Sequence, residues 1–243
     1  MFLKFSRLLL PLICVVGLNV PLQAYAFGND ILTIGGGFSQ GYINTNGNNY
    51  LGETRDGSFK ATEAFINFHL QPHRRIHLAT QLLHRRVGDT ATNNDNLSLE
   101  YGLIGVSLLA RESFAISAKI GRIKIPTGFY NETRDIPSSK PGIILPRGYY
   151  YESNRDSISN DGAALDIAWQ NELGDFQLDL QRGKIRTSSS NLKQLDLAGL
   201  AFSSKVTGNM ANIARVNYFT PDGQWRLAFS LVDQRLGFDF DID

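Results

Sequence analysis

Cysteine is almost absent from this chain, which has one, Cys14, among its 243 residues. A single cysteine cannot form an intramolecular disulfide, so the small disulfide-stapled folds are excluded. Histidine is also scarce, with four residues. The spacing of His69, His73 and His77 by four would suit zinc on a helix, but Pro72 interrupts the segment and both flanks alternate with a period of two. No metal site is therefore predicted.

An excess of charge of one sign is equally lacking. The chain has 24 Lys and Arg against 23 Asp and Glu, which gives a net charge of +1. A nucleic-acid partner would normally leave a basic excess, so none is expected. Beyond the N-terminus the chain also lacks an apolar run of about 18 residues, the length of a membrane-spanning helix. The mean hydropathy of −0.17 is ordinary, but a transmembrane β-barrel has a similar average because its strands alternate lipid-facing and lumen-facing residues.

Motifs of catalysis and of cofactor binding are missing as well. There is no Gly-x-Ser-x-Gly nucleophile elbow, and the glycine-rich residues 35–41 are neither a phosphate-binding fingerprint nor followed by a helical pattern. We therefore predict no enzyme activity and no cofactor. One catalytic alternative stays open, a barrel phospholipase of the outer membrane. His84 is its only suitable histidine, and the sequence identifies no partner serine.

The N-terminus differs in kind from the rest of the chain. Lys4 and Arg7 precede an apolar core at residues 8–18, and Ala24-Tyr25-Ala26 matches a small-x-small cleavage pattern. These features predict a secretory signal peptide over residues 1–26 and a mature chain over residues 27–243. A membrane anchor helix is the alternative, but the apolar run is short and contains a proline.

From residue 31 onward, apolar residues recur at every second position in short blocks. For example, Leu165, Ile167 and Trp169 alternate with Asp166 and Gln170. This period is typical of strands with one apolar face, so the fold is predicted to be all-β. Ten strands are expected, at residues 31–43, 58–70, 76–87, 97–108, 114–125, 162–170, 176–184, 192–204, 212–219 and 225–232.

The connections between these strands are alternately long and short, apart from the ninth, at residues 220–224. Short periplasmic turns and long external loops are typical of antiparallel transmembrane β-barrels. The first connection is long, as expected for a chain that starts in the periplasm, and the longest covers residues 126–161. A soluble periplasmic β-sandwich or adhesin would show the same alternation and remains the alternative.

The C-terminal residues predict the start of a further strand. After residues 233–235, Phe238, Phe240 and Ile242 alternate with aspartates. An open sheet edge cannot lie in lipid, and bacterial single-chain barrels have even strand numbers. We therefore expect the chain to be the truncated N-terminal portion, ten or eleven strands, of a barrel of about sixteen.

Four segments resemble porin-like outer-membrane proteins of Gram-negative bacteria. They are residues 36–42 (GGFSQGY), 48–52 (NNYLG), 121–135 (GRIKIPTGFYNETRD) and 141–146 (PGIILP), of which the Gly-Arg-x-Lys-x-Pro-x-Gly stretch is the most specific. The resemblance implies a homotrimeric, water-filled pore for passive diffusion of small hydrophilic solutes or ions. The implied surroundings are outer-membrane lipid and lipopolysaccharide. It also implies that the third external loop folds into the barrel and narrows it.

Candidate pore-lining and constriction residues follow from this resemblance and from the strand pattern. In the loop over residues 126–161 they are Glu132, Arg134, Asp135, Lys140, Arg147, Arg155 and Asp156. On the wall they are Glu63, Arg85, Glu100, Lys119, Arg122 and Lys124, with His77, Asp166, Asp179, Arg215 and Arg226 as further lumen candidates. Arg122 shares the parity of the apolar Ile116 and Ile120, so we expect either a bulge that turns the strand or a place at the membrane rim.

Overall fold

A computed structural model describes residues 14–27, 31–45, 54–87, 97–129, 131, 159–185 and 203–241. These residues form ten strands and no helix, and hence no helix long and apolar enough to cross a membrane. The strands are β1 (Cys14–Phe27), β2 (Leu32–Asn44), β3 (Ser58–His73), β4 (Ile76–Val87), β5 (Ser98–Ala110), β6 (Phe114–Lys124), β7 (Ser159–Asn171), β8 (Gly174–Ile185), β9 (Ser203–Phe219) and β10 (Arg226–Asp241).

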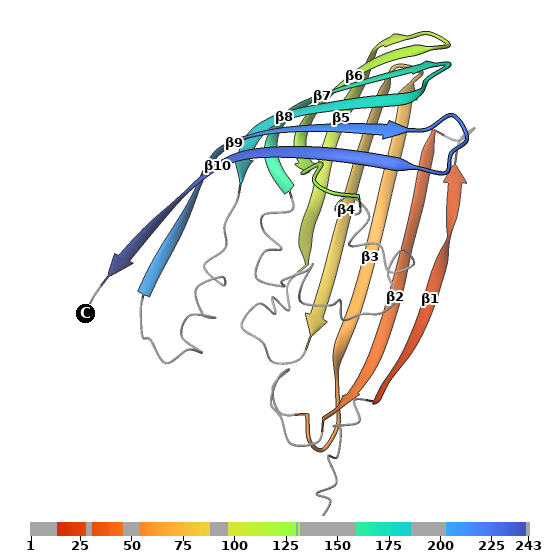
Figure 1. Ribbon diagram of the computed structural model, residues 1–243. Helices are drawn as coiled ribbons and strands as arrows, with labels where there is room; N and C mark the ends of the chain where they lie inside the picture. The colour runs from red at the N-terminus through yellow and green to blue at the C-terminus, as the bar shows by residue number, and fades with distance from the viewer. Residues whose placement is uncertain are drawn as a thin grey trace, which may run out of the picture.

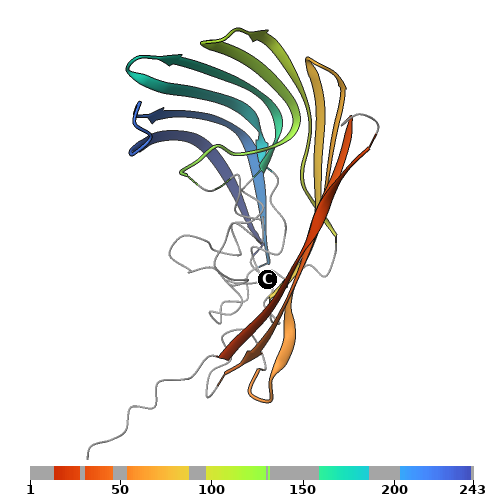
Figure 2. The ribbon, with the colours of Figure 1, turned by 90° about the vertical axis from the view of Figure 1, so that its right-hand side faces the viewer.

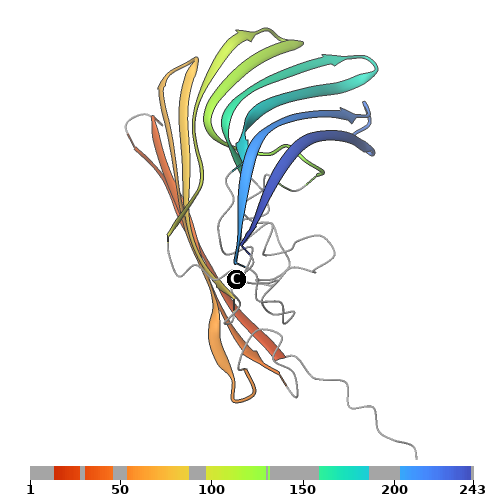
Figure 3. The ribbon, with the colours of Figure 1, turned by 90° about the vertical axis from the view of Figure 1, so that its left-hand side faces the viewer.

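All ten strands belong to one antiparallel sheet, in which each strand pairs with its neighbours in sequence (Figure 1). The sheet is strongly curved, with β1 to β4 in one arm and β5 to β10 bending over towards it (Figures 2 and 3). Within the described residues β1 and β10 do not pair, so the sheet is open. The all-β, antiparallel architecture predicted from the sequence is confirmed.

The first seven predicted strands correspond to β2 through β8, with differences of three residues or fewer at their ends. The ninth predicted strand is part of β9, which begins at Ser203, whereas residues 192–202 of the eighth lie outside the described residues. Residues 205–211, which were expected to form a short turn, continue β9 and pair with β10. Their polar composition reflects the end of the strand that lies beyond the apolar residues.

The prediction of a new strand near the C-terminus is also wrong. Residues 233–241 extend β10, with a register shift between Gln234 and Leu236 in place of a turn. The extra residue of this bulge lies on β9, between Gly208 and Ala211, so β10 continues past Gln234 without a break. With both corrections, nine strands of the described residues follow residue 31, and the connections between them alternate between long and short up to β10.

Strand β1 comes from the segment predicted to be a signal peptide. It pairs with β2 along nearly its whole length, with one register shift between Leu22 and Tyr25. The alternative of an anchor helix over these residues is therefore not observed. Removal of residues 1–26 on export stays a prediction.

The turn between β9 and β10 is held by side chains. The backbone amides of Gln224 and Trp225 donate to Asp222 and Thr220 at 3.1 Å, and the Thr220 hydroxyl also donates to Asp222. Gly223 has a φ of 67°, a left-handed conformation that glycine adopts without strain. These contacts explain why Thr-Pro-Asp-Gly-Gln forms a tight connection.

The Asp222 carboxyl is expected to titrate below the range of an unstructured peptide. The hydrogen bond from the Thr220 hydroxyl has the largest effect and that from the Gln224 amide the next largest, and both lower the pKa of the carboxyl. Because the folded pKa is lowered, the carboxylate stabilises the turn above the unfolded pKa, and this contribution is lost as the pH falls through the lowered value. An NMR titration of the carboxyl resonance measures the midpoint. A midpoint unchanged by Thr220→Val would contradict this explanation.

Candidate functional site: a polar concave face and an apolar convex face

The concave face of the sheet carries a row of polar and charged side chains across five strands. In register order from β6 to β10 the row is Ser117, Asp166, Asp179, Arg215 and Ser230. Arg215 Nε donates to Asp179 Oδ2 at 2.7 Å, and Lys119 Nζ lies 2.7 Å from Asp166 Oδ2. Opposite charges on neighbouring strands therefore neutralise each other along the wall.

Several of these polar side chains are almost fully buried. The Arg215 and Asp179 side chains are 2% and 4% exposed, and the pair of Arg85 with Glu63, 3.7 Å apart, is 4% and 0% exposed. Charges this deeply buried are stable only when they are paired and hydrogen-bonded. Among the described residues, most of the largest fully buried side chains are polar rather than apolar.

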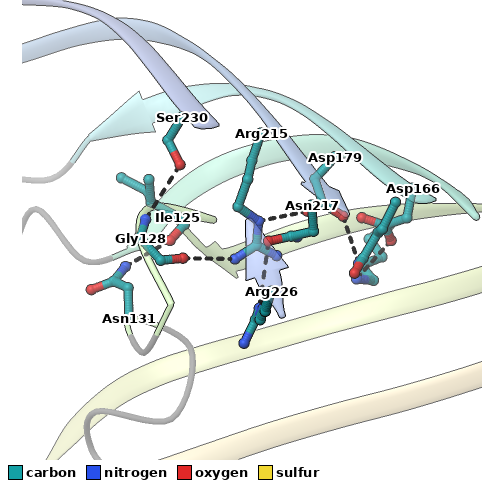
Figure 4. A network of polar contacts seen from close by, with 11 residues as sticks. Ile125, Gly128, Asn131, Asp166, Asp179, Arg215, Asn217, Arg226 and Ser230 are labelled. Atoms are coloured by element: carbon teal, nitrogen blue, oxygen red, sulfur yellow. Dashed lines mark hydrogen bonds and ion pairs between the residues drawn. The ribbon is translucent and has the colours of Figure 1, made fainter. Parts of the chain in front are cut away.

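The segment that follows β6 lies against this concave face at β9 and β10 (Figure 4). Gly128 donates its amide to Ser230 Oγ at 3.3 Å, and its carbonyl accepts from Arg215 Nη1 at 3.4 Å. The guanidinium of Arg226 lies 5.1 Å from the ring of Phe129. Asn131 closes the turn by donating to the Ile125 carbonyl. The start of the long connection after β6 is therefore fixed to the concave face.

The convex face has the opposite character. Large apolar side chains project from it and are exposed, including Ile120 at 62%, Leu231 at 61% and Phe229 at 71%. Across β6 to β10 they form two complete rows in register: Ile116, Ile167, Leu178, Val216 and Phe229, and then Ala118, Leu165, Leu180, Ala214 and Leu231. A water-soluble protein would bury such a continuous apolar surface.

Rows of different chemistry border this apolar band. At the turn end lie the aromatic Phe114, Trp169, Phe176 and Tyr218, in which Trp169 stacks on Phe176 at 5.0 Å between ring centroids. At the loop end the rows contain Arg122, Asp161, Arg182, Lys184 and Asp233.

Arg122 lies at the rim of the convex face. The β6–β7 ladder runs from Ile116 to Arg122 without a register shift. The one shift between β5 and β6 lies opposite Ile116 and Ser117 and adds its residue to β5, so β6 itself is not turned over. Arg122 Nε donates to Asp161 Oδ1 at 3.0 Å, and its Nη1 donates to the Leu99 carbonyl at 2.8 Å. The structure thus favours a position at the rim over a strand turned by a bulge. Because its side chain lies on the convex face, Arg122 is no longer a candidate pore-lining residue.

The other sequence-predicted residues divide into two groups. Glu63, Arg85 and Lys119 lie on the concave face, as do Asp166, Asp179, Arg215 and Arg226, while Glu100 and Lys124 are buried near the loop ends of β5 and β6. The predictions for Glu132, Arg134, Asp135, Lys140, Arg147, Arg155 and Asp156 fall outside the described residues. The loop-borne charges therefore stay predictions.

Sequence reasoning missed the buried amides of the same face. Gln181 Nε2 donates to Asn160 Oδ1 at 2.6 Å and to the Ile123 carbonyl at 3.2 Å, which ties β8 to β7 and β6. Asn217 is fully buried beside Arg226. Each occupies the polar parity of its strand, which was the signal that could have identified it.

Within the described ranges, no three His, Cys, Asp or Glu side chains are placed to hold a metal ion. Of the aromatic residues near the turn end, Trp169, Phe176 and Tyr218 lie in the convex row, whereas Phe219 lies under Arg226 on the concave face. No protein-family model matches the chain, and neither the curated proteins nor the solved structures contain a significant match to it.

Proposed function

We propose that this chain forms the wall of a porin-like β-barrel channel in the bacterial outer membrane, through which small hydrophilic solutes or ions diffuse passively. The observation that carries the proposal is the inverted distribution of the two faces. Paired charges such as Arg215 and Asp179 are buried on the concave face, while residues such as Phe229 are exposed on the convex face. Lipid outside and water inside is the arrangement in which this distribution is stable.

Polar amides are buried on the concave face. Neither side-chain atom of Gln81 has a hydrogen-bond partner in the described part of the chain, and the same holds for Asn160 Nδ2 and Asn217 Nδ2. A buried amide without a partner costs roughly 1–3 kcal/mol, and ordered water molecules held within the wall would supply the partners. Solute selection would then depend on pore width and wall charge, with no covalent step.

The remaining parts of the proposal follow from the membrane setting. In lipid the unpaired edges of the sheet must be satisfied, so the strands close into a barrel, which in porins associates as a trimer. Export through the periplasm requires the predicted signal peptide. The segment after β6, fixed by Arg215 and Ser230, begins the loop that narrows the pore.

Two other functions fit the geometry less well. A β-sandwich would cover the convex face with a second sheet, but the described strands form one sheet only. A barrel lipase requires a serine beside His84, but the cross-strand neighbour of His84 on β3 is Ala64. Neither reading explains the buried charge pairs of the concave face.

A planar bilayer experiment tests the channel. Full-length protein reconstituted into the bilayer is expected to give stepwise conductance. In a KCl gradient, Lys119→Gln should shift the reversal potential towards cation preference, because it leaves the Asp166 charge on the wall uncompensated.

The matched control is Arg86→Gln, which removes one positive charge from the outward parity of β4, opposite Thr62. Its reversal potential should equal that of the unmodified protein. A folded, membrane-inserted protein without conductance would refute the channel.

A further inference from the structure

The hairpin of β3 and β4 contains three of the four histidines of the chain, His69, His73 and His77. Their spacing by four would place them on a shared face only in a helix, and the segment forms two antiparallel strands instead. The hairpin nevertheless brings two of them together. The ring centroids of His69 and His77 are 5.9 Å apart, and the ring planes are 14° from parallel.

The register between the strands explains why the two rings meet. His69 and His77 both have the concave parity, and their cross-strand partners are the small residues Ala79 and Gly105. A Cβ on Gly105 would lie 2.0 Å from His77 Cε1 and 2.2 Å from its Nε2. The His77 imidazole therefore lies directly over the backbone of β5, and the side chain opposite His69 on β4 is only a methyl group.

The nitrogens of both rings are available to a ligand. His69 is exposed and His77 is half-buried, and neither imidazole makes a hydrogen bond or an ion pair with any residue that the structure describes. A neutral imidazole has one nitrogen that carries a lone pair, so the two rings offer two lone pairs. Besides His69, the charges that act on His77 are those of Lys119 and Asp166, which lie 2.7 Å apart and neutralise each other.

We infer that His69 and His77 form a two-histidine site for a divalent transition-metal ion, of the class that includes Cu²⁺ and Zn²⁺. Imidazole nitrogens suit these ions and bind them at about 2 Å. Two imidazoles that share an ion then have ring centroids roughly 4.5–6.4 Å apart, depending on the angle at the metal. The observed 5.9 Å lies within this range. Rotation about χ2, which is broad for histidine, aims one nitrogen of each ring at the ion, and water completes its coordination.

Titration of the tag-free, detergent-solubilised full chain with Cu²⁺ tests the inference, because copper binds nitrogen ligands most tightly among the first-row divalent ions. Isothermal titration calorimetry should show one such ion bound per chain. Electron paramagnetic resonance should show the splitting produced by two nitrogen ligands. His69→Gln and His77→Gln should each weaken binding at least about tenfold, since either variant leaves a single imidazole.

The matched control is His84→Gln, which removes a histidine from the convex parity of the same strand, opposite Ala64. This variant should bind copper as the unmodified protein does. Unchanged affinity in either His69→Gln or His77→Gln, an equal loss in the control, or a spectrum with a single nitrogen ligand would overturn the inference. The bilayer assay on the same preparations separates the two proposals: copper binding without conductance refutes only the channel, and conductance without copper binding refutes only the metal site.

Discussion

Replacing Asp179 with alanine is expected to lower the free energy of unfolding by about 3–5 kcal/mol. The change leaves the Arg215 guanidinium, whose side chain is 2% exposed, without its 2.7 Å partner on the concave face. Breaking a buried ion pair at one end is costly because the remaining charge is desolvated and uncompensated. Urea unfolding from lipid vesicles, followed by tryptophan fluorescence, measures the loss.

The variant Asp166→Ala tests whether burial is the cause of the loss. Asp166→Ala removes a carboxylate that is also 2.7 Å from a cation, but the side chains of Lys119 and Asp166 are 31% and 17% exposed. Its cost should be about 1 kcal/mol or less. If Asp166→Ala and Asp179→Ala lower the free energy of unfolding equally, burial is not what makes the Arg215–Asp179 pair important.

The double variant Asp179→Leu/Arg215→Met separates the effect of losing the ion pair from the effect of losing side-chain volume. Replacing both charges with apolar residues removes the desolvation cost together with the attraction, so it should be less destabilising than Asp179→Ala alone. The same variant removes the donor to the Gly128 carbonyl, which helps to fix the segment after β6. Single-channel recordings should therefore show noisier open levels even where stability is retained.

The period-two pattern was sufficient to locate β2 to β8, because each has one apolar and one polar face. Leu165 and Ile167, for example, fall on the convex face and Asp166 on the concave face, as their parity requires. The polar parity also identified Asp179 and Arg215 as members of one wall. What it could not give was their pairing, since the register between strands is set by contacts far apart in sequence.

The failures near β9 and β10 have a shared physical cause. Beyond the apolar band a strand no longer needs apolar residues, so Lys205 to Ala211 are as polar as a turn although they pair with β10. A bulge in β9 between Gly208 and Ala211 also shifts the parity of that strand on its two sides. Arg122 shows the opposite case, because its parity was read correctly and only its height on the wall was unknown.

The glycine row between β6 and β8 is a feature that only the register reveals. Gly121, Gly162 and Gly183 are direct cross-strand neighbours on the concave parity, and Ala211 continues the row on β9. Without side chains on that face, adjacent backbones can approach closely and the sheet can bend sharply. These strands lie where the sheet curves over in Figures 2 and 3.

Gly162→Ala is therefore expected to destabilise the sheet by about 1–3 kcal/mol, in the range of overpacked cores. A Cβ at this position would lie 2.1 Å from the Arg182 carbonyl oxygen and 2.4 Å from Gly183 Cα. Both are backbone atoms of β8, so no side-chain rotation can relieve the contact, and the two strands must separate at that pair. The loss is measured by the same urea titration.

Gly102→Ala is the matched control, because its Cβ would meet nothing closer than Leu99 side-chain carbons at 3.5 Å. Alanine is also less costly than glycine to order in a strand, so the stability of this variant should be unchanged or slightly raised. Comparable losses in both variants would mean that glycine content in general, rather than close strand approach at β7 and β8, limits the stability. A loss confined to Gly162→Ala would instead tie the curvature of the wall to the residues that lack a side chain on its concave face, the face that the proposed channel leaves open to water.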